Sequence, residues 1–99
     1  MTDRELLELA AKAAGLPHQW CDAWNTMAKT SPDGGFVFNH VWNPLTDDGD
    51  ALRLAVQLGL LGAPFMTLAW IEALGDSDPF AATRRAIVRA AAEIGRAMK

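Results

Sequence analysis

The 99-residue chain has very few of the residues that build disulfides or metal sites. Its single cysteine, Cys21, excludes an internal disulfide and is typical of a reducing, cytoplasmic setting. Structural zinc needs four ligands, usually in short paired spacings. His18, Cys21 and His40 offer one short pair and one distant histidine. We therefore expect no metal and no cofactor.

Catalytic motifs are missing as well. A reactive thiolate needs a positively charged setting, whereas Cys21 stands between Trp20 and Asp22. The glycine pair at 34–35 precedes a strand-like segment, and a phosphate-binding loop should precede a helix. We therefore expect a protein that is not an enzyme. A small hydrolase using His40 or Cys21 is the third of three functional hypotheses.

Positive charge and long apolar runs are also scarce. The net charge of −3 argues against a nucleic-acid partner, because phosphate contacts need a positive face. The longest uncharged apolar run, 58–71, is shorter than the roughly 20 residues that a membrane span needs. The charged N-terminus lacks the apolar region of a signal peptide. These features predict one globular, cytoplasmic domain, 1–99, that does not bind membranes.

Hydrophobic periodicity predicts helices at both ends of the chain. The first, over about 2–15, begins with a capping box between Thr2 and Glu5. The last, over about 79–98, has Asp78 as its cap and a proline at its first position. Its expected apolar stripe consists of Phe80, Ile87, Ala91, Ile94 and Met98.

A third helix, over about 46–59, is expected to be the core of the fold. Its polar strip is narrow, because only Asp50, Arg53 and Gln57 are polar along that side. A helix that is apolar over most of its circumference is normally buried on most sides. We therefore predict that the other elements enclose this helix.

Three acidic residues, Asp47, Asp48 and Asp50, cluster at the start of that helix. An EF-hand would need a bidentate glutamate at its twelfth position, which falls on Leu58 or Gly59 here. Carboxylates are favoured at helix N-termini, where they cap amide groups and suit the helix dipole. The cluster therefore predicts capping, by Thr46 or an aspartate, and not a cation site.

Strands are expected between the helices. Residues 36–42 alternate clearly and follow a turn over 31–35, and the apolar run 65–71 is typical of a buried strand. The apolar residues of 18–29 fit helical spacing as well as the alternation of a strand. Because the turn over 31–35 and the strand over 36–42 follow, a hairpin is favoured, and we predict a strand over about 19–28. The fold class is then α+β, with about three helices on a small antiparallel sheet.

Two kinds of residue are candidates for binding a partner. Tryptophan is enriched among interface anchors, and of the four tryptophans we expect Trp20 or Trp24 to face a partner while most are core. Arginines on the last helix form a basic stripe, which is either a solvated face or a docking site for an acidic partner. The stripe consists of Arg85, Arg89, Arg96 and Lys99.

Two stretches together carry a family resemblance: WNPLTDDGDALRLAV over 42–56 and RRAIVRAAAEIG over 84–95. With the first helix, they resemble small phage and prophage proteins of unknown function, similar to the NinX proteins of lambdoid phages. Residues 60–78 depart from that pattern because they look short for the family. The resemblance brings no catalytic residues. It implies a phage accessory protein in the bacterial cytoplasm.

Three hypotheses follow. The leading one is a stoichiometric binder that inhibits or modulates a host defence protein or complex, for example as an anti-CRISPR. The second is a small-ligand binder, a sponge for a nucleotide signal, with Arg53, Arg85 or Arg89 at the phosphates and a tryptophan on the base. The third is the hydrolase. The apolar content also makes a homodimer a reasonable expectation.

Overall fold

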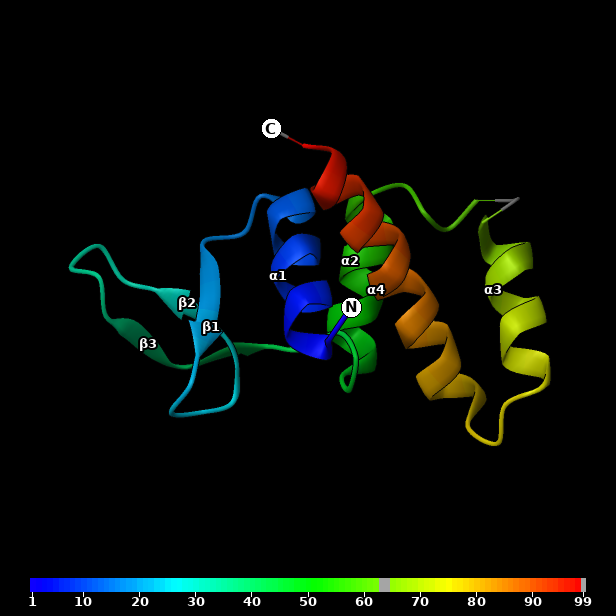
Figure 1. Cartoon of the computed structure of the whole chain (residues 1–99), viewed down its shortest axis with the longest axis horizontal. Coiled ribbons are helices and arrows are strands. Elements are labelled where there is room, and N and C mark those ends of the chain that lie inside the picture. The colour runs from blue at the N-terminus through cyan, green and yellow to red at the C-terminus, as the bar shows by residue number, and fades with distance from the viewer. Residues whose placement is uncertain (63–64, 99) are drawn as a thin grey trace.

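The computed structural model describes residues 1–62 and 65–98, without the side chains of residues 38–40, 70 and 72. Within these residues the fold is α+β, as predicted. The elements follow the order α1 (Asp3–Ala14), β1 (His18–Cys21), β2 (Thr26–Thr30), β3 (Phe36–Trp42), α2 (Asp48–Gln57), α3 (Phe65–Leu74) and α4 (Pro79–Ala97). Figure 1 shows the sheet at one end, α1, α2 and α4 in the middle, and α3 at the other end.

The helices begin where the capping residues predict. The Thr2 hydroxyl accepts from the Glu5 amide at 3.2 Å, and the Glu5 carboxylate completes the capping box. An Asp47 oxygen accepts from the amide of Asp50 at 2.9 Å, and Asp78 accepts from the amide of Ala81 at 3.1 Å. These caps confirm the predicted starts of α1, α2 and α4 to within about two residues.

The central helix is α4, and the prediction that α2 lies at the core is wrong. α4 packs against α1, α3 and α2, whereas α2 packs mainly on α4. On α2, Leu52 and Val56 are each more than half exposed, and the buried side chains are Ala51, Leu54 and Ala55. The apolar circumference of α2 therefore did not mean enclosure, because two of its large apolar side chains meet solvent.

Small residues let α4 take the central position. Its buried residues are Ala86, Ile87, Val88, Ala91, Ala92 and Gly95. The predicted stripe is only partly right, because Ile87 and Ala91 are buried while Phe80, Ile94 and Met98 are exposed. The true face is rotated toward the small side chains, since these allow α1 to approach α4 closely.

The sheet has three antiparallel strands in the order β1-β2-β3. The predicted strand over 19–28 is wrong at its centre, because residues 22–25 form a turn that separates β1 from β2. Asn25 takes a positive φ of 51°, a conformation that asparagine tolerates better than most residues. Opposite Met27 on β2 lies Trp42 on β3, and both are buried in the core with α1. We call this side the inner face of the sheet.

The predicted strand over 65–71 is also wrong, because these residues belong to the helix α3. An uninterrupted apolar run has no period that distinguishes strand from helix, and the three residues that follow it, Glu72, Ala73 and Leu74, are helix formers. In the described part of the chain, no helix combines the length and the apolar character that crossing a membrane requires.

Candidate functional site

The acidic cluster at the start of α2 is occupied by contacts within the chain. Asp50 accepts from the backbone amide of Asn43 at 3.0 Å and from Arg53 at 2.6 Å. Asp48 pairs with Arg84 at 2.6 Å, while Asp47 caps the helix. Among the described residues there is no group of three or more His, Cys, Asp or Glu side chains that could hold a metal ion. These contacts give the cluster an architectural role.

Cys21, the candidate nucleophile of the hydrolase hypothesis, lies inside the protein. Cys21 is buried at the end of β1, and a buried thiol is poorly reactive because reagents cannot reach it. The ring of His18 lies 6.1 Å from the ring of Trp42 on the inner face of the sheet. The side chain of His40, the other candidate base, lies outside the described residues. This burial gives a Cys21-based reaction no accessible group.

Most of the basic stripe makes contacts within the chain. Arg85 donates to a carboxylate oxygen of Asp3 at 3.2 Å, and Arg96 pairs with Glu93 at 2.9 Å. Lys99 lies outside the described residues. The interpretation of this stripe as a solvated, internally paired helix face therefore fits Arg85 and Arg96.

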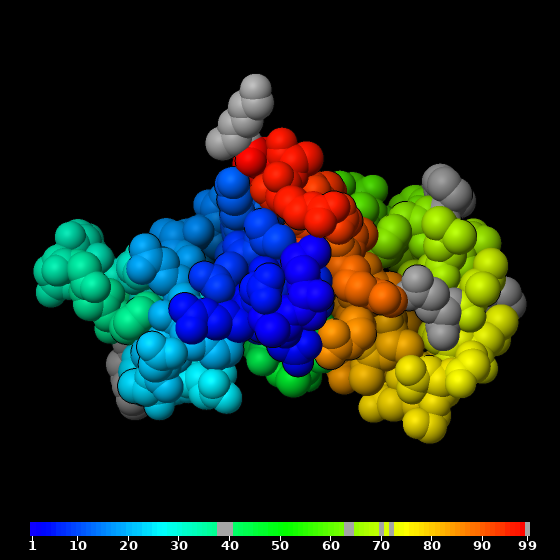
Figure 2. Space-filling model, viewed as in Figure 1, coloured from blue at the N-terminus to red at the C-terminus, as the bar shows by residue number. Residues whose placement is uncertain are grey.

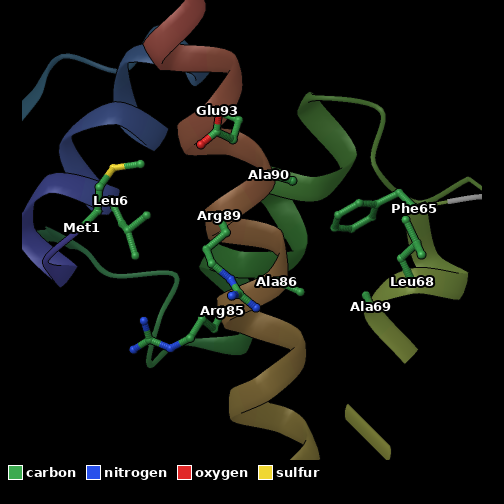
Figure 3. A pocket seen from close by; sticks show the side chains of 10 residues that line it. All are labelled: Met1, Leu6, Phe65, Leu68, Ala69, Arg85, Ala86, Arg89, Ala90 and Glu93. Atoms are coloured by element: carbon green, nitrogen blue, oxygen red, sulfur yellow. The ribbon is translucent and has the colours of Figure 1, made fainter. Parts of the chain in front are cut away.

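Arg89 lines a hollow of about 620 Å³ between α1, α3 and α4. Figure 3 shows Phe65 pointing from α3 toward α4, and Arg85 directed to the side where α1 begins. Glu93 belongs to the same lining, and Arg85 already contacts Asp3. The hollow thus brings two arginines together, as a nucleotide site requires, but adjacent carboxylates offset their charge.

The sequence-predicted tryptophans lie on opposite faces of the sheet. Trp20 lies in the row of Met27 and Trp42, with Arg4 of α1 5.4 Å from its ring centre. Its indole N–H donates to Asp22 at 3.0 Å. Trp20 is therefore engaged with α1 and with its own turn. Of the other tryptophans, Trp42 is core, and the side chain of Trp70 is not among those described.

Trp24 lies on the opposite, outer face. Its ring centre is 6.2 Å from that of Phe36, at an interplanar angle of 55°. Trp24 is 39% exposed, Phe36 is 38% exposed, and Val41 is 54% exposed. Val41 pairs with Ala28, and Phe36 pairs with Thr30. Val41 and Phe36 therefore point to the face of the sheet opposite the one that carries Met27. We call Trp24, Phe36 and Val41 the outer sheet patch.

Sequence reasoning found Trp24 but missed its two neighbours. Strict alternation places Phe36 and Val41 on opposite faces, because they are five residues apart. A register shift between Ala28 and Thr30 changes the phase of β3 against β2 and puts both side chains on one face. The structure does not bring Trp24 together with Trp20. The predicted basic residues are also far from the patch, because α4 carries Arg85, Arg89 and Arg96 and α1 lies between α4 and the sheet (Figure 1).

A second exposed apolar area among the described residues lies on the helical side of the molecule. A groove of about 430 Å³ runs between α2, α3 and α4. Its walls include Leu52, Leu61 and Phe80, which are exposed, and Met66. The Arg84–Asp48 ion pair lies among its lining residues. Exposed apolar area of this kind is typical of protein–protein contact surfaces.

Comparisons of the chain with protein-family models, with curated proteins and with solved structures found no match.

Proposed function

We propose that this chain is a non-catalytic accessory protein that binds a host bacterial protein through its outer sheet patch. The observation that supports this is the exposed ring contact between Trp24 and Phe36, with Val41 exposed on the same face of the sheet. Large aromatic side chains dominate binding energy at protein interfaces, because they bury much apolar area with few rotatable bonds. Phe36 on β3 and Trp24 in the turn before β2 already contact each other in the free protein, and side chains ordered before binding lose less entropy on association.

The surroundings of the patch fit a protein partner better than a small ligand. The patch lies on a sheet face, and the hollow and the groove described above are formed by helices. Gln19 on β1 is exposed and lies in the same row as Ala28 and Val41, and a polar rim around an apolar centre is the usual interface pattern. In this proposal the bound host protein is a component of a defence system, for example a CRISPR surveillance complex, which the chain inhibits or modulates.

A phage challenge tests this function. The chain is expressed in bacterial strains that differ only in one defence system, and the plating efficiency of a sensitive phage is measured in each. Binding to a defence component should raise plating efficiency in one strain and leave a defence-free strain unchanged. Equal plating in all strains, with and without the chain, would contradict the proposal.

The nucleotide-signal sponge is the second candidate, and the hollow between α1, α3 and α4 is the observation that favours it. Arg85 and Arg89 both line this hollow, with Phe65 as an aromatic neighbour. The hollow suits an anion poorly because Arg85 already pairs with Asp3 and the Glu93 carboxylate belongs to the lining. A thermal-shift screen with nucleotides distinguishes the two candidates. A nucleotide-dependent rise in Tm that Arg89→Ala removes would favour the sponge.

A further inference from the structure

The groove between α2, α3 and α4 has walls of exposed apolar side chains. Leu52 on α2 is 54% exposed, and Phe80 on α4 is 69% exposed. Val56, one turn further along α2 from Leu52, is also more than half exposed and extends the same wall. Large apolar side chains that are this exposed and this close together are typical of a surface that another molecule covers.

The two ends of the groove differ in charge. α2 and α4 begin at the same end, where Asp48 in the first turn of α2 pairs with Arg84 of α4 at 2.6 Å (Figure 1). At the other end, Leu61 follows α2 and Met66 lies in the first turn of α3. Among the described lining residues, Asp48 and Arg84 are the charged ones, so the charge lies where α2 and α4 begin.

Negative charge prevails at that end of the groove. Four exposed aspartates stand there: Asp47 and Asp48 at the start of α2, and Asp76 and Asp78 just before α4. Asp47 and Asp78 cap the helices and Asp76 accepts from the Asp78 amide, but these hydrogen bonds bring no positive charge. Arg84 supplies one positive charge, and each helix start adds roughly half of one. The remaining excess is negative and favours a cationic partner.

We propose that this groove binds a basic amphipathic helix of a partner protein. Its lining covers one turn of α2, over 48–52, and two turns of α4, over 80–87. Helices pack by placing the side-chain ridges of one between those of another, so a groove with helical walls accepts a further helix. The partner helix would set apolar residues spaced by three and four on Leu52 and Phe80, and a lysine or arginine at the acidic end.

Other occupants fit the groove less well. Nucleic acid is disfavoured because its phosphates would face the four aspartates. A second copy lacks a suitable helix to offer. α1 and α4 carry most of the basic residues of the chain, and both bury their apolar faces in the core. The chemistry therefore favours a helix from a different protein.

This site is separate from the outer sheet patch and goes beyond the proposed function. The sheet and α3 form opposite ends of the molecule in both views (Figures 1 and 2). A helix bound in the groove would leave Trp24 and Phe36 accessible. The chain would then hold two proteins at once, one at each end. Trp24→Ala should accordingly leave binding at the groove unchanged.

Selection from a displayed library of helical peptides tests the chemistry of the occupant. Peptides of about four helical turns, randomised among apolar, acidic and basic residues, are selected on the full chain. A folded Leu52→Gln/Phe80→Ala variant serves for counter-selection. The enriched peptides should carry apolar residues spaced by three and four and a net positive charge. Enrichment of acidic or unpatterned peptides, or of none that depends on the groove, would overturn the proposal.

Matched variants locate the site with a fluorescent helical peptide of leucine and lysine. Phe80→Ala should weaken its binding by about tenfold or more, whereas Phe36→Ala, at the other end of the molecule, should not change it. Asp47→Asn combined with Asp78→Asn should weaken binding about two- to tenfold at low salt, because asparagine keeps the helix caps but removes the charge. Asp33→Asn, in the turn before β3, is the charge control and should have no effect.

Each competing explanation gives a different result. Equal binding of a proline-containing peptide of the same composition would show that no helix is recognised and would overturn the proposal. Unchanged binding to a folded Phe80→Ala protein would do the same. A wild-type chain that sediments at twice its mass of 10.7 kDa, and that Phe80→Ala converts to single copies, would assign the groove to a second copy and refute the partner helix.

Discussion

Gly95 on α4 lies directly against the backbone of Leu9 on α1. A Cβ atom added to Gly95 would overlap the carbonyl oxygen of Leu9 and would come within 2.8 Å of its carbonyl carbon. The atoms that it would meet are backbone atoms, which cannot rotate away as a side chain could. This close approach of the two helices depends on the absence of a side chain at position 95.

Gly95→Ala should therefore destabilise the protein. In an exposed helix the same substitution would be favourable by about 1 kcal/mol, but here overpacking should cost about 1–3 kcal/mol net. Denaturant unfolding measures the change. Gly75→Ala is the matched control, because a Cβ there meets nothing within 4 Å, and its effect should stay within about 0.5 kcal/mol. Equal effects at both glycines would contradict the close approach.

Arg84 joins α4 to the segment before α2, and its loss should be costly. Its Nε donates to the Leu45 carbonyl at 2.9 Å, and its Nη1 pairs with Asp48 at 2.6 Å. Arg84→Ala leaves a half-buried carbonyl without this donor, so we expect a loss of about 1–3 kcal/mol of unfolding free energy. Arg96→Ala removes only an exposed pair with Glu93 and should cost less than about 0.5 kcal/mol. A reversed order of these two effects would refute the role of Arg84.

The turn between β2 and β3 should show a measurable dependence on pH. The Ser31 hydroxyl and the Gly35 amide donate to the Asp33 carboxylate, and this holds the pKa of Asp33 below its usual value of 3.8. The stabilising contribution of Asp33 is thus present above 3.8 and is lost as the pH falls through the lowered folded-state pKa. Titration of the carboxyl carbon by NMR should show this lowered pKa. Ser31→Ala should move the pKa back toward 3.8, and no movement would show that the hydroxyl is not the main cause.

Two tryptophans should separate stability from binding. Trp42 is buried in the core, so Trp42→Ala should cost about 3–5 kcal/mol of unfolding free energy. Trp24→Ala removes a half-exposed ring and its contact with Phe36, which should cost no more than about 1.5 kcal/mol. Thermal unfolding of both variants provides the measurement. A Trp24→Ala loss as large as that of Trp42→Ala would assign Trp24 to the core and remove it from the patch.

The helix starts were predictable because capping is local. Thr2, Asp47 and Asp78 act on amides within the next three residues, so nothing distant is needed to recognise them. The identity of the central helix was not predictable in the same way. It depends on which small residues meet across two helices, and the contact between Gly95 and Leu9 joins positions that are far apart in the sequence.

The errors in the middle of the chain have physical causes too. Residues 65–71 lack a hydrophobic period that would distinguish a helix from a strand. Their helical conformation therefore depends on packing against α4, which the sequence pattern does not show. The turn at Asn25 needed a positive φ, and a lone Asn in an alternating segment is a weak signal for it. For the candidate site, Trp24 was predictable from residue type, but Phe36 and Val41 join it only through the shift in register between β2 and β3.

The central claim is that the outer sheet patch binds a host defence component, and the most direct measurement is phage plating with patch variants. In the strain where the wild-type chain raises plating efficiency, Trp24→Ala and Val41→Asp should abolish the increase while the proteins stay folded. Lys29→Ala, an exposed site on β2 that pairs with His18 on the inner face of the sheet, should retain it. Full activity of a folded Trp24→Ala/Val41→Asp double variant would contradict the account.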